Sequence, residues 1–129
     1  MPSLNRVQII GRLGKDPVEK TTKKGTKFAI FTVAVDRRWK GSDGNSHKET
    51  DWFNVESWGR LGEVCLEYLT KGRLIFLEGR LRTDRYEKDG DVKFFTKVIA
   101  RQMQMLDYQS QDKKEPDIAE LEEEVPEEE

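Results

Sequence analysis

Aromatic side chains interleaved with basic ones are the residues of this 129-residue sequence whose types and spacing suggest a chemistry. Trp39, Trp58 and Tyr86 each lie within two residues of a Lys or an Arg. An aromatic ring can stack on the face of any nucleobase, at about 1–3 kcal/mol per base, while Lys and Arg attract phosphates. This combination favours single-stranded nucleic acid, because reading a duplex calls for a helix or ribbon that presents polar side chains to a groove.

The alternation of residues 51–58 places two tryptophans on the polar side of an expected strand. Trp52 and Trp58 share a face with Asn54 and Glu56, since successive side chains of a strand point to opposite faces. Asn54 and Glu56 are expected in water or in a polar interface, so this face is not the core. Both indoles are therefore expected on a solvent-exposed face, where burial does not explain them. A second interpretation stays open, in which both rings are half-buried under a loop or in a subunit contact.

The segment 74–82 repeats this pattern. Glu78, Arg80 and Arg82 share one face, and continued alternation brings Tyr86 to the same side. A ring and cations on one strand face again favour binding of a single strand.

Other candidate chemistry has a simpler structural explanation. Gly14 and the lysine after it lack the glycine and hydroxyl residues of a phosphate-binding loop, and His47 is the only histidine. Cys65 falls on the apolar stripe of a helix, which it shares with Leu61, Val64, Tyr68 and Leu69, so it is expected in the core. Asp89 and Asp91 flank a turn glycine. We therefore predict no enzyme activity, no metal and no cofactor.

The elements that must position these side chains are five strands and one helix. A polar loop is expected over 41–50 and a hairpin turn over 88–91. A five-stranded Greek-key barrel with a helix between its third and fourth strands is an OB-fold, which is mainly β and binds oligonucleotides on its open face. The strands are predicted over 4–12, 27–36, 51–58, 74–82 and 92–101, and the helix over 61–69.

The charges divide the chain into a basic body and an acidic tail. Residues 112–129 contain ten acidic and two basic residues, a charge of −8, whereas the rest has 21 basic and 15 acidic residues, a charge of +6. We predict a folded domain over 1–108 and a disordered tail over 109–129, which competes with nucleic acid for the basic groove. No signal peptide or membrane span is apparent, so a soluble, cytoplasmic protein is expected.

Several spaced motifs resemble, in the same order, those of the bacterial single-stranded DNA-binding protein family. The resemblance extends from about Asn5 to Leu106 and covers nearly all of the predicted domain. The motifs are Asn5-Arg-Val-Gln-Ile-Ile-Gly-Arg-Leu-Gly-Lys-Asp-Pro17, Phe28-Ala-Ile-Phe-Thr-Val-Ala-Val35, Asp51-Trp-Phe-Asn-Val55, Trp58-Gly-Arg-Leu61, Tyr68-Leu-Thr-Lys-Gly72, Glu78-Gly-Arg-Leu-Arg82 and Met103-Gln-Met-Leu106.

The resemblance implies an OB-fold that assembles as a homotetramer and binds single-stranded DNA without sequence preference in replication, recombination and repair. The family's stacking aromatics fall at Trp39, Trp52, Trp58 and Tyr86. Candidates for its phosphate contacts are Arg6, Arg12, Lys40, Arg60, Lys71, Arg82 and Arg85.

The end of the tail departs from the family, which commonly ends in an acidic run followed by Pro-Phe that docks replication and repair proteins. The corresponding residues here are Glu122, Glu123, Glu124, Val125 and Pro126, and the chain has no terminal Phe. An aromatic anchor carries much of such a short contact, so weaker docking is expected. An OB-fold that binds proteins, as primosomal relatives do, is the alternative function; its tryptophans would contact a partner.

Overall fold

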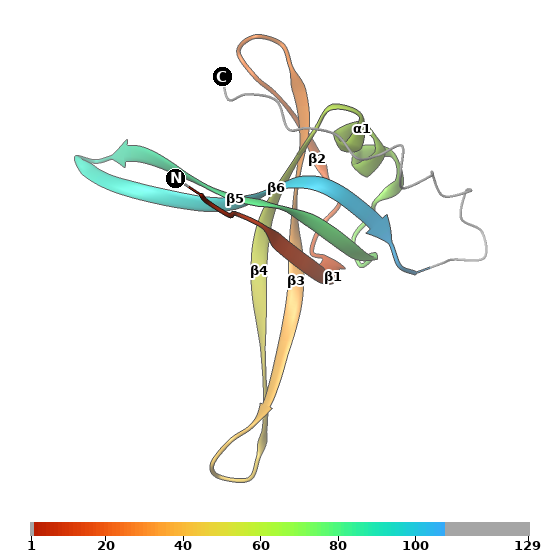
Figure 1. The fold of residues 1–129 in the computed structure, drawn as a ribbon, viewed down its shortest axis with the longest axis vertical. Coiled ribbons are helices and arrows are strands. Elements are labelled where there is room, and N and C mark those ends of the chain that lie inside the picture. Colours follow the sequence, from red (N-terminus) through yellow and green to blue (C-terminus); the bar gives the residue numbers. More distant parts are fainter. Residues whose placement is uncertain (1, 108–129) are drawn as a thin grey trace.

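The computed structural model describes residues 2–107 of the chain (Figure 1). The predicted tail and its docking residues lie outside the described residues, so the domain boundary stays a prediction. The elements, in chain order, are β1 (Val7–Leu13), β2 (Val18–Thr21), β3 (Lys27–Lys40), β4 (Ser46–Trp58), α1 (Gly59–Tyr68), β5 (Leu74–Lys88) and β6 (Asp91–Met105).

Five of the strands close into a barrel. The strand order is β1-β5-β6-β4-β3, and β1 pairs back onto β3 through Arg12 and Leu13. Gly11 lies at this closure, where a Cβ atom would be 2.3 Å from the carbonyl oxygen of Ala34, so only glycine lets β1 approach β3 this closely. The predicted barrel, with its helix between β4 and β5, is confirmed.

A sixth strand, β2, extends the sheet beyond β3 and was not predicted. Its four residues are all exposed, and their sequence shows no alternation of apolar and polar residues that would have predicted a strand. Backbone pairing with β3, from Val18 opposite Ile30 to Thr21 opposite Lys27, holds it in place.

The prediction of a polar loop over 41–50 is wrong in its length, because the loop is shorter. Lys40 already pairs with Ser46, so β4 begins at Ser46 and only the residues between them form the turn. Polar contacts replace apolar burial along this hairpin: Arg37 binds Asp51 at 2.7 Å and Glu49 at 3.3 Å. Hydrophobic periodicity therefore could not reveal that these strands continue.

The core is formed by the buried side chains of all five barrel strands together with those of α1, which packs on β3 and β4. Leu61, Val64 and Cys65 of the predicted apolar stripe are buried, as is Leu69 just after the helix. Burial raises the pKa of the Cys65 thiol to about 12, and Ser57 is its hydrogen-bond neighbour at 3.8 Å. The prediction that Cys65 is a core residue is confirmed.

Two long hairpins extend from the barrel in different directions (Figure 1). The β3–β4 hairpin pairs continuously from Phe28 opposite Trp58 to Lys40 opposite Ser46. The β5–β6 hairpin pairs from Ile75 opposite Met105 to Lys88 opposite Asp91, with an irregularity at Gly79. These hairpins carry Trp39 and Tyr86.

An ion pair fastens the end of β6 to the start of β5. Arg73, which is buried, donates from Nε to Asp107 Oδ1 at 2.9 Å, and the Leu74 N–H donates to Oδ2 at 3.2 Å. Partial burial alone would raise the pKa of Asp107, but the Leu74 N–H and the Arg73 guanidinium outweigh it, so this pKa lies below its ordinary value of 3.8.

Asp107→Asn is expected to lower the free energy of unfolding at pH 7 by about 1–3 kcal/mol, because the ion pair between Asp107 and the buried Arg73 is lost. The pKa of Asp107 is lower in the folded state, so this stabilisation is present above the unfolded value of 3.8 and is lost as pH falls through the folded value. Urea unfolding at pH 7 and pH 3 measures both effects. Asp91→Asn, at the exposed first residue of β6, is the control; equal losses from the two variants would contradict the prediction.

Candidate nucleic-acid interface

Trp52 is an exposed ring on the outer wall of the barrel. Its side chain is 60% exposed, although it lies in the middle of the sheet opposite Ala34. A Cβ atom on Gly14 would be 2.5 Å from Cζ3 of this indole, so the ring packs directly on the Gly14 backbone. The predicted solvent-exposed position of Trp52 is confirmed. Its ring is held against the outer wall by the contact with the Gly14 backbone.

Trp58 lies on the same wall but is half-buried. Its ring stacks on Phe28 with centroids 4.1 Å apart and planes 13° apart, and Nε1 donates to Glu56 Oε1 at 3.0 Å. Glu56 is only 8% exposed, so of its two predicted surroundings, water or a polar interface, water is wrong and the polar one is found. Lys97, whose ammonium contacts the Glu56 carboxylate from β6, makes that burial tolerable.

Trp39 lies toward the tip of the β3–β4 hairpin and is 42% exposed. His47, its cross-strand partner, stacks on it with centroids 5.4 Å apart, and the Arg37 guanidinium lies 5.5 Å from the ring centroid. A hollow of about 430 Å³ beside the ring is lined in part by Arg38 and Lys48. A ring and several cations thus lie together at this hairpin, as predicted.

The alternation along β3 and β4 separates Trp39 from Trp52. Trp39 is on the face of β3 that carries the buried Val33, whereas Trp52 lies opposite Ala34 on the other face. The predicted stacking residues therefore do not form one continuous row on a single sheet face.

Tyr86 is 45% exposed on the β5–β6 hairpin. It lies on the same strand face as Arg82, as the alternation predicted, and opposite Lys93 of β6. Arg82 in turn approaches Glu56, at 3.9 Å, so this face of the hairpin continues the outer wall that carries Trp58.

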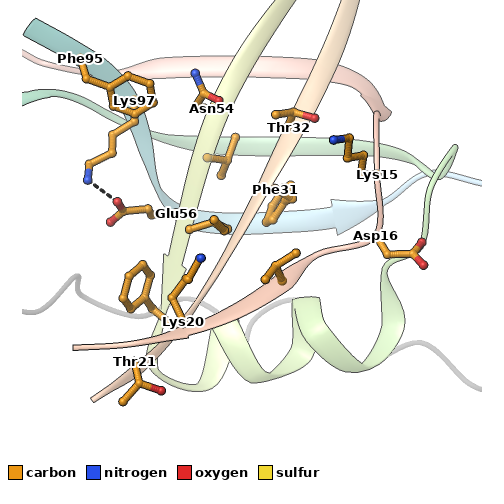
Figure 2. A pocket seen from close by; sticks show the side chains of 14 residues that line it. Lys15, Asp16, Lys20, Thr21, Phe31, Thr32, Asn54, Glu56, Phe95 and Lys97 are labelled. Atoms are coloured by element: carbon orange, nitrogen blue, oxygen red, sulfur yellow. Dashed lines mark hydrogen bonds and ion pairs between the residues drawn. The ribbon is translucent and has the colours of Figure 1, made fainter. Parts of the chain in front are cut away.

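A cavity of about 560 Å³ opens on this outer wall (Figure 2). Phe28, Asn54, Phe95 and Lys97 line it from β3, β4 and β6. From the segment that precedes and forms β2, the lining residues are Lys15, Asp16, Val18, Lys20 and Thr21. Sequence reasoning missed Phe28 and Phe95 as site residues. Phe95 lies two residues before Lys97, and this alternation of ring and cation is the signal that could have identified it.

The predicted phosphate contacts are not gathered in one place. Arg6 binds Glu78 at 2.9 Å, and Arg12 donates to the Gly72 carbonyl at 2.9 Å; neither lines the cavity. Arg82 lies 3.2 Å from Asp84. The remaining candidates are exposed residues: Lys40, beside Trp39; Arg60, at the start of α1; Lys71, after the helix; and Arg85, beside Tyr86.

The comparisons with known proteins agree with this geometry. Residues 4–106 match the model of the single-strand binding protein family. The chain belongs to this family. The resemblance in the sequence is thereby confirmed, as is the OB-fold that the family's solved members share with this barrel.

Single-strand binding proteins of several organisms are similar to this chain. It is 41% identical over 105 residues to single-stranded DNA-binding protein 1 of Chlorobaculum tepidum, covering 80% of this chain and 65% of that one. It is 46% identical over 107 residues to single-stranded DNA-binding protein 2 of Streptococcus agalactiae serotype III, covering 83% and 80%. The chain thus spans about two thirds to four fifths of these relatives.

Two solved single-strand binding proteins share the fold. The Plasmodium falciparum protein, in complex with single-stranded DNA, superposes with a TM-score of 0.76 at 28% identity, over 83% of this chain and 98% of that one. A deletion mutant of the Thermus aquaticus single-stranded DNA-binding protein gives 0.71 at 32% identity, over 81% and 51%.

The described part of the chain contains no helix long and apolar enough to cross a membrane. Within the same residues, no three His, Cys, Asp or Glu side chains are grouped so that they could hold a metal ion.

Proposed function

We propose that this protein binds single-stranded DNA without sequence preference and protects it during replication, recombination and repair. The observation that carries this proposal is the exposed ring of Trp52 on the outer barrel wall of a chain that belongs to the single-strand binding protein family. Burial in the monomer does not account for an indole that is 60% exposed, whereas stacking on a base does.

The proposed mechanism is capture by charge followed by stacking. Exposed cations, among them Lys40, Lys71 and Arg85, attract the phosphates, and the bases then stack on the exposed rings. Neither step distinguishes one base from another, because phosphates are uniform and every base has a π-face. The protein acts as a binding protein, with no bond made or broken.

Tryptophan fluorescence titrated with oligo-dT tests this function. We expect strong quenching at low salt, weaker quenching at high salt and none with duplex DNA, because stacking needs an unpaired base and phosphate contacts depend on salt. A flat trace would contradict the proposal and favour the alternative of an OB-fold that binds proteins.

We further propose that the protein is a homotetramer in the bacterial cytoplasm, bound to DNA of the nucleoid. Ile10 is 57% exposed on β1 and lies opposite Phe76 of β5, an apolar pair on an outer face that assembly would cover. The relatives from Chlorobaculum and Streptococcus are bacterial proteins. Sedimentation equilibrium should give four times the mass of one chain; a monomer would overturn the assembly but not the binding.

Docking of replication and repair proteins by the acidic residues 122–126 is a proposal that rests on the sequence alone.

A further inference from the structure

Four charged side chains form a cluster on the outer wall, at the edge of the 560 Å³ cavity. Lys97 contacts Glu56 and lies 2.8 Å from Asp84, and Arg82 lies 3.2 Å from Asp84 and 3.9 Å from Glu56. Figure 2 shows Lys97 reaching toward Glu56 across the cavity wall. The cluster joins β4, β5 and β6, which bring together residues up to 41 positions apart.

The cluster is electrically neutral, with two cations and two carboxylates. Burial alone would raise the pKa of Asp84, but Lys97 and Arg82 outweigh it and hold this pKa below the ordinary value. The side chains of Glu56, Lys97 and Arg82 are 10%, 11% and 16% exposed, whereas that of Asp84 is 33% exposed. Asp84 is thus the member of the cluster most exposed to solvent.

The position of Asp84 matters because proposed DNA contacts flank it. On β5 it lies on the same face as Arg82 and Tyr86, two residues from each. Across the hairpin it is opposite Phe95, which lines the cavity together with Lys97. Asp84 therefore lies between two of the proposed DNA contacts, Arg82 and Tyr86, on the face that carries both.

We propose that Asp84 limits the affinity of the interface for single-stranded DNA by occupying Arg82 and Lys97, the two cations that a phosphate would otherwise contact there. The inference rests on the proposed function. A phosphate that approaches these cations meets a carboxylate already bound to both, and it is repelled by that negative charge. Without Asp84 the remaining three side chains carry a net charge of +1.

Asp84→Asn tests the proposal, because asparagine keeps the shape and removes the charge. We expect affinity for oligo-dT to rise about three- to tenfold at low salt, and the slope of log K against log salt to steepen by about 0.7 for each additional phosphate that the protein neutralises. Asp91→Asn is the matched control: it removes the same charge from the same hairpin, at an exposed position opposite Lys88 and away from the cluster.

Three outcomes would overturn the inference: unchanged affinity of Asp84→Asn, weaker binding by a variant whose melting curve shows it folded, or an equal rise in affinity from Asp91→Asn, which would mean that bulk charge is responsible. In an Arg82→Gln background the rise should shrink, since one of the released cations is absent. Failure of the proposed function is a separate result, because the unsubstituted protein would then leave its tryptophan fluorescence unquenched by oligo-dT.

Discussion

Trp58→Ala is expected to lose both affinity for single-stranded DNA and stability, whereas Trp52→Ala is expected to lose affinity alone. The two rings lie on the same wall of β4, but their surroundings differ. Trp52 is 60% exposed, and Trp58 is half-buried against Phe28.

For Trp52→Ala we expect a loss of about 1–3 kcal/mol in binding free energy, about five- to 150-fold in Kd, because one base loses its stacking ring. The fold should be little affected, since most of the ring faces solvent in the free protein. Its loss uncovers the Gly14 backbone on which it packs.

For Trp58→Ala we expect a similar loss of affinity and, in addition, a loss of about 2–3 kcal/mol in the free energy of unfolding. The substitution removes the ring stacked on Phe28, and truncation of a large half-buried ring leaves a cavity. It also takes away the Nε1–H that Glu56 accepts in a buried position.

Oligo-dT binding followed by fluorescence anisotropy, together with urea unfolding of the same samples, separates these effects. Trp52→Phe is the control, since it keeps a stacking ring and should retain most of the affinity. If Trp52→Ala unfolds, its ring belongs to the core; if Trp58→Ala is as stable as the unsubstituted protein, the contacts with Phe28 and Glu56 contribute nothing.

Lys97→Met is expected to lower the free energy of unfolding by about 3 kcal/mol, a loss as large as that expected for Trp58→Ala. Removing one partner of a buried ion pair leaves the other charge uncompensated, and the two side chains here are 11% and 10% exposed. The loss should lie at the low end of the usual range, because Glu56 keeps the Trp58 N–H at 3.0 Å and Arg82 at 3.9 Å.

Arg6→Met is the matched control in the same urea experiment. Arg6 binds Glu78 at 2.9 Å, closer than many ion pairs, but the Arg6 side chain is 59% exposed. The Glu78 side chain is 14% exposed, but it keeps the Gln8 amide at 3.0 Å. A pair with one exposed partner contributes little, so the free energy of unfolding should fall by at most about 1 kcal/mol. Equal losses in the two variants would show that burial of the Glu56–Lys97 pair has no special weight.

Alternation along the chain was sufficient to predict the strands that carry an apolar face. The five barrel strands, the helix stripe of Leu61, Val64 and Cys65, and the exposed side of Trp52 all follow from a periodicity of two or of about 3.6. β2 and the outer part of the β3–β4 hairpin were missed, because backbone pairing and ion pairs hold them instead of apolar burial. β5 was likewise predicted to end at Arg82, whereas its pairing with β6 continues to Lys88.

The residue types of the candidate site could be predicted from the sequence, but the contacts between their side chains could not. The alternation placed Glu56 beside two tryptophans on a polar face, where a carboxylate is expected in water or in a polar interface. Its burial depends on Lys97, which is 41 residues away and reaches it only because β4 and β6 pair in parallel. No local pattern contains that information.

The sequence alone determined which residue types could bind a single strand. It placed aromatic rings between cations, on strands whose alternation of side chains could be followed along the chain. Which of these residues are free to act depends on the folded chain. Folding leaves Trp52 exposed, packs Trp58 on Phe28, and gives Arg82 and Lys97 the carboxylate of Asp84. The sequence could not show these contacts, because the alternation of side chains is a property of each strand by itself. An ion pair or a ring stack depends instead on the register between strands that are far apart in the chain.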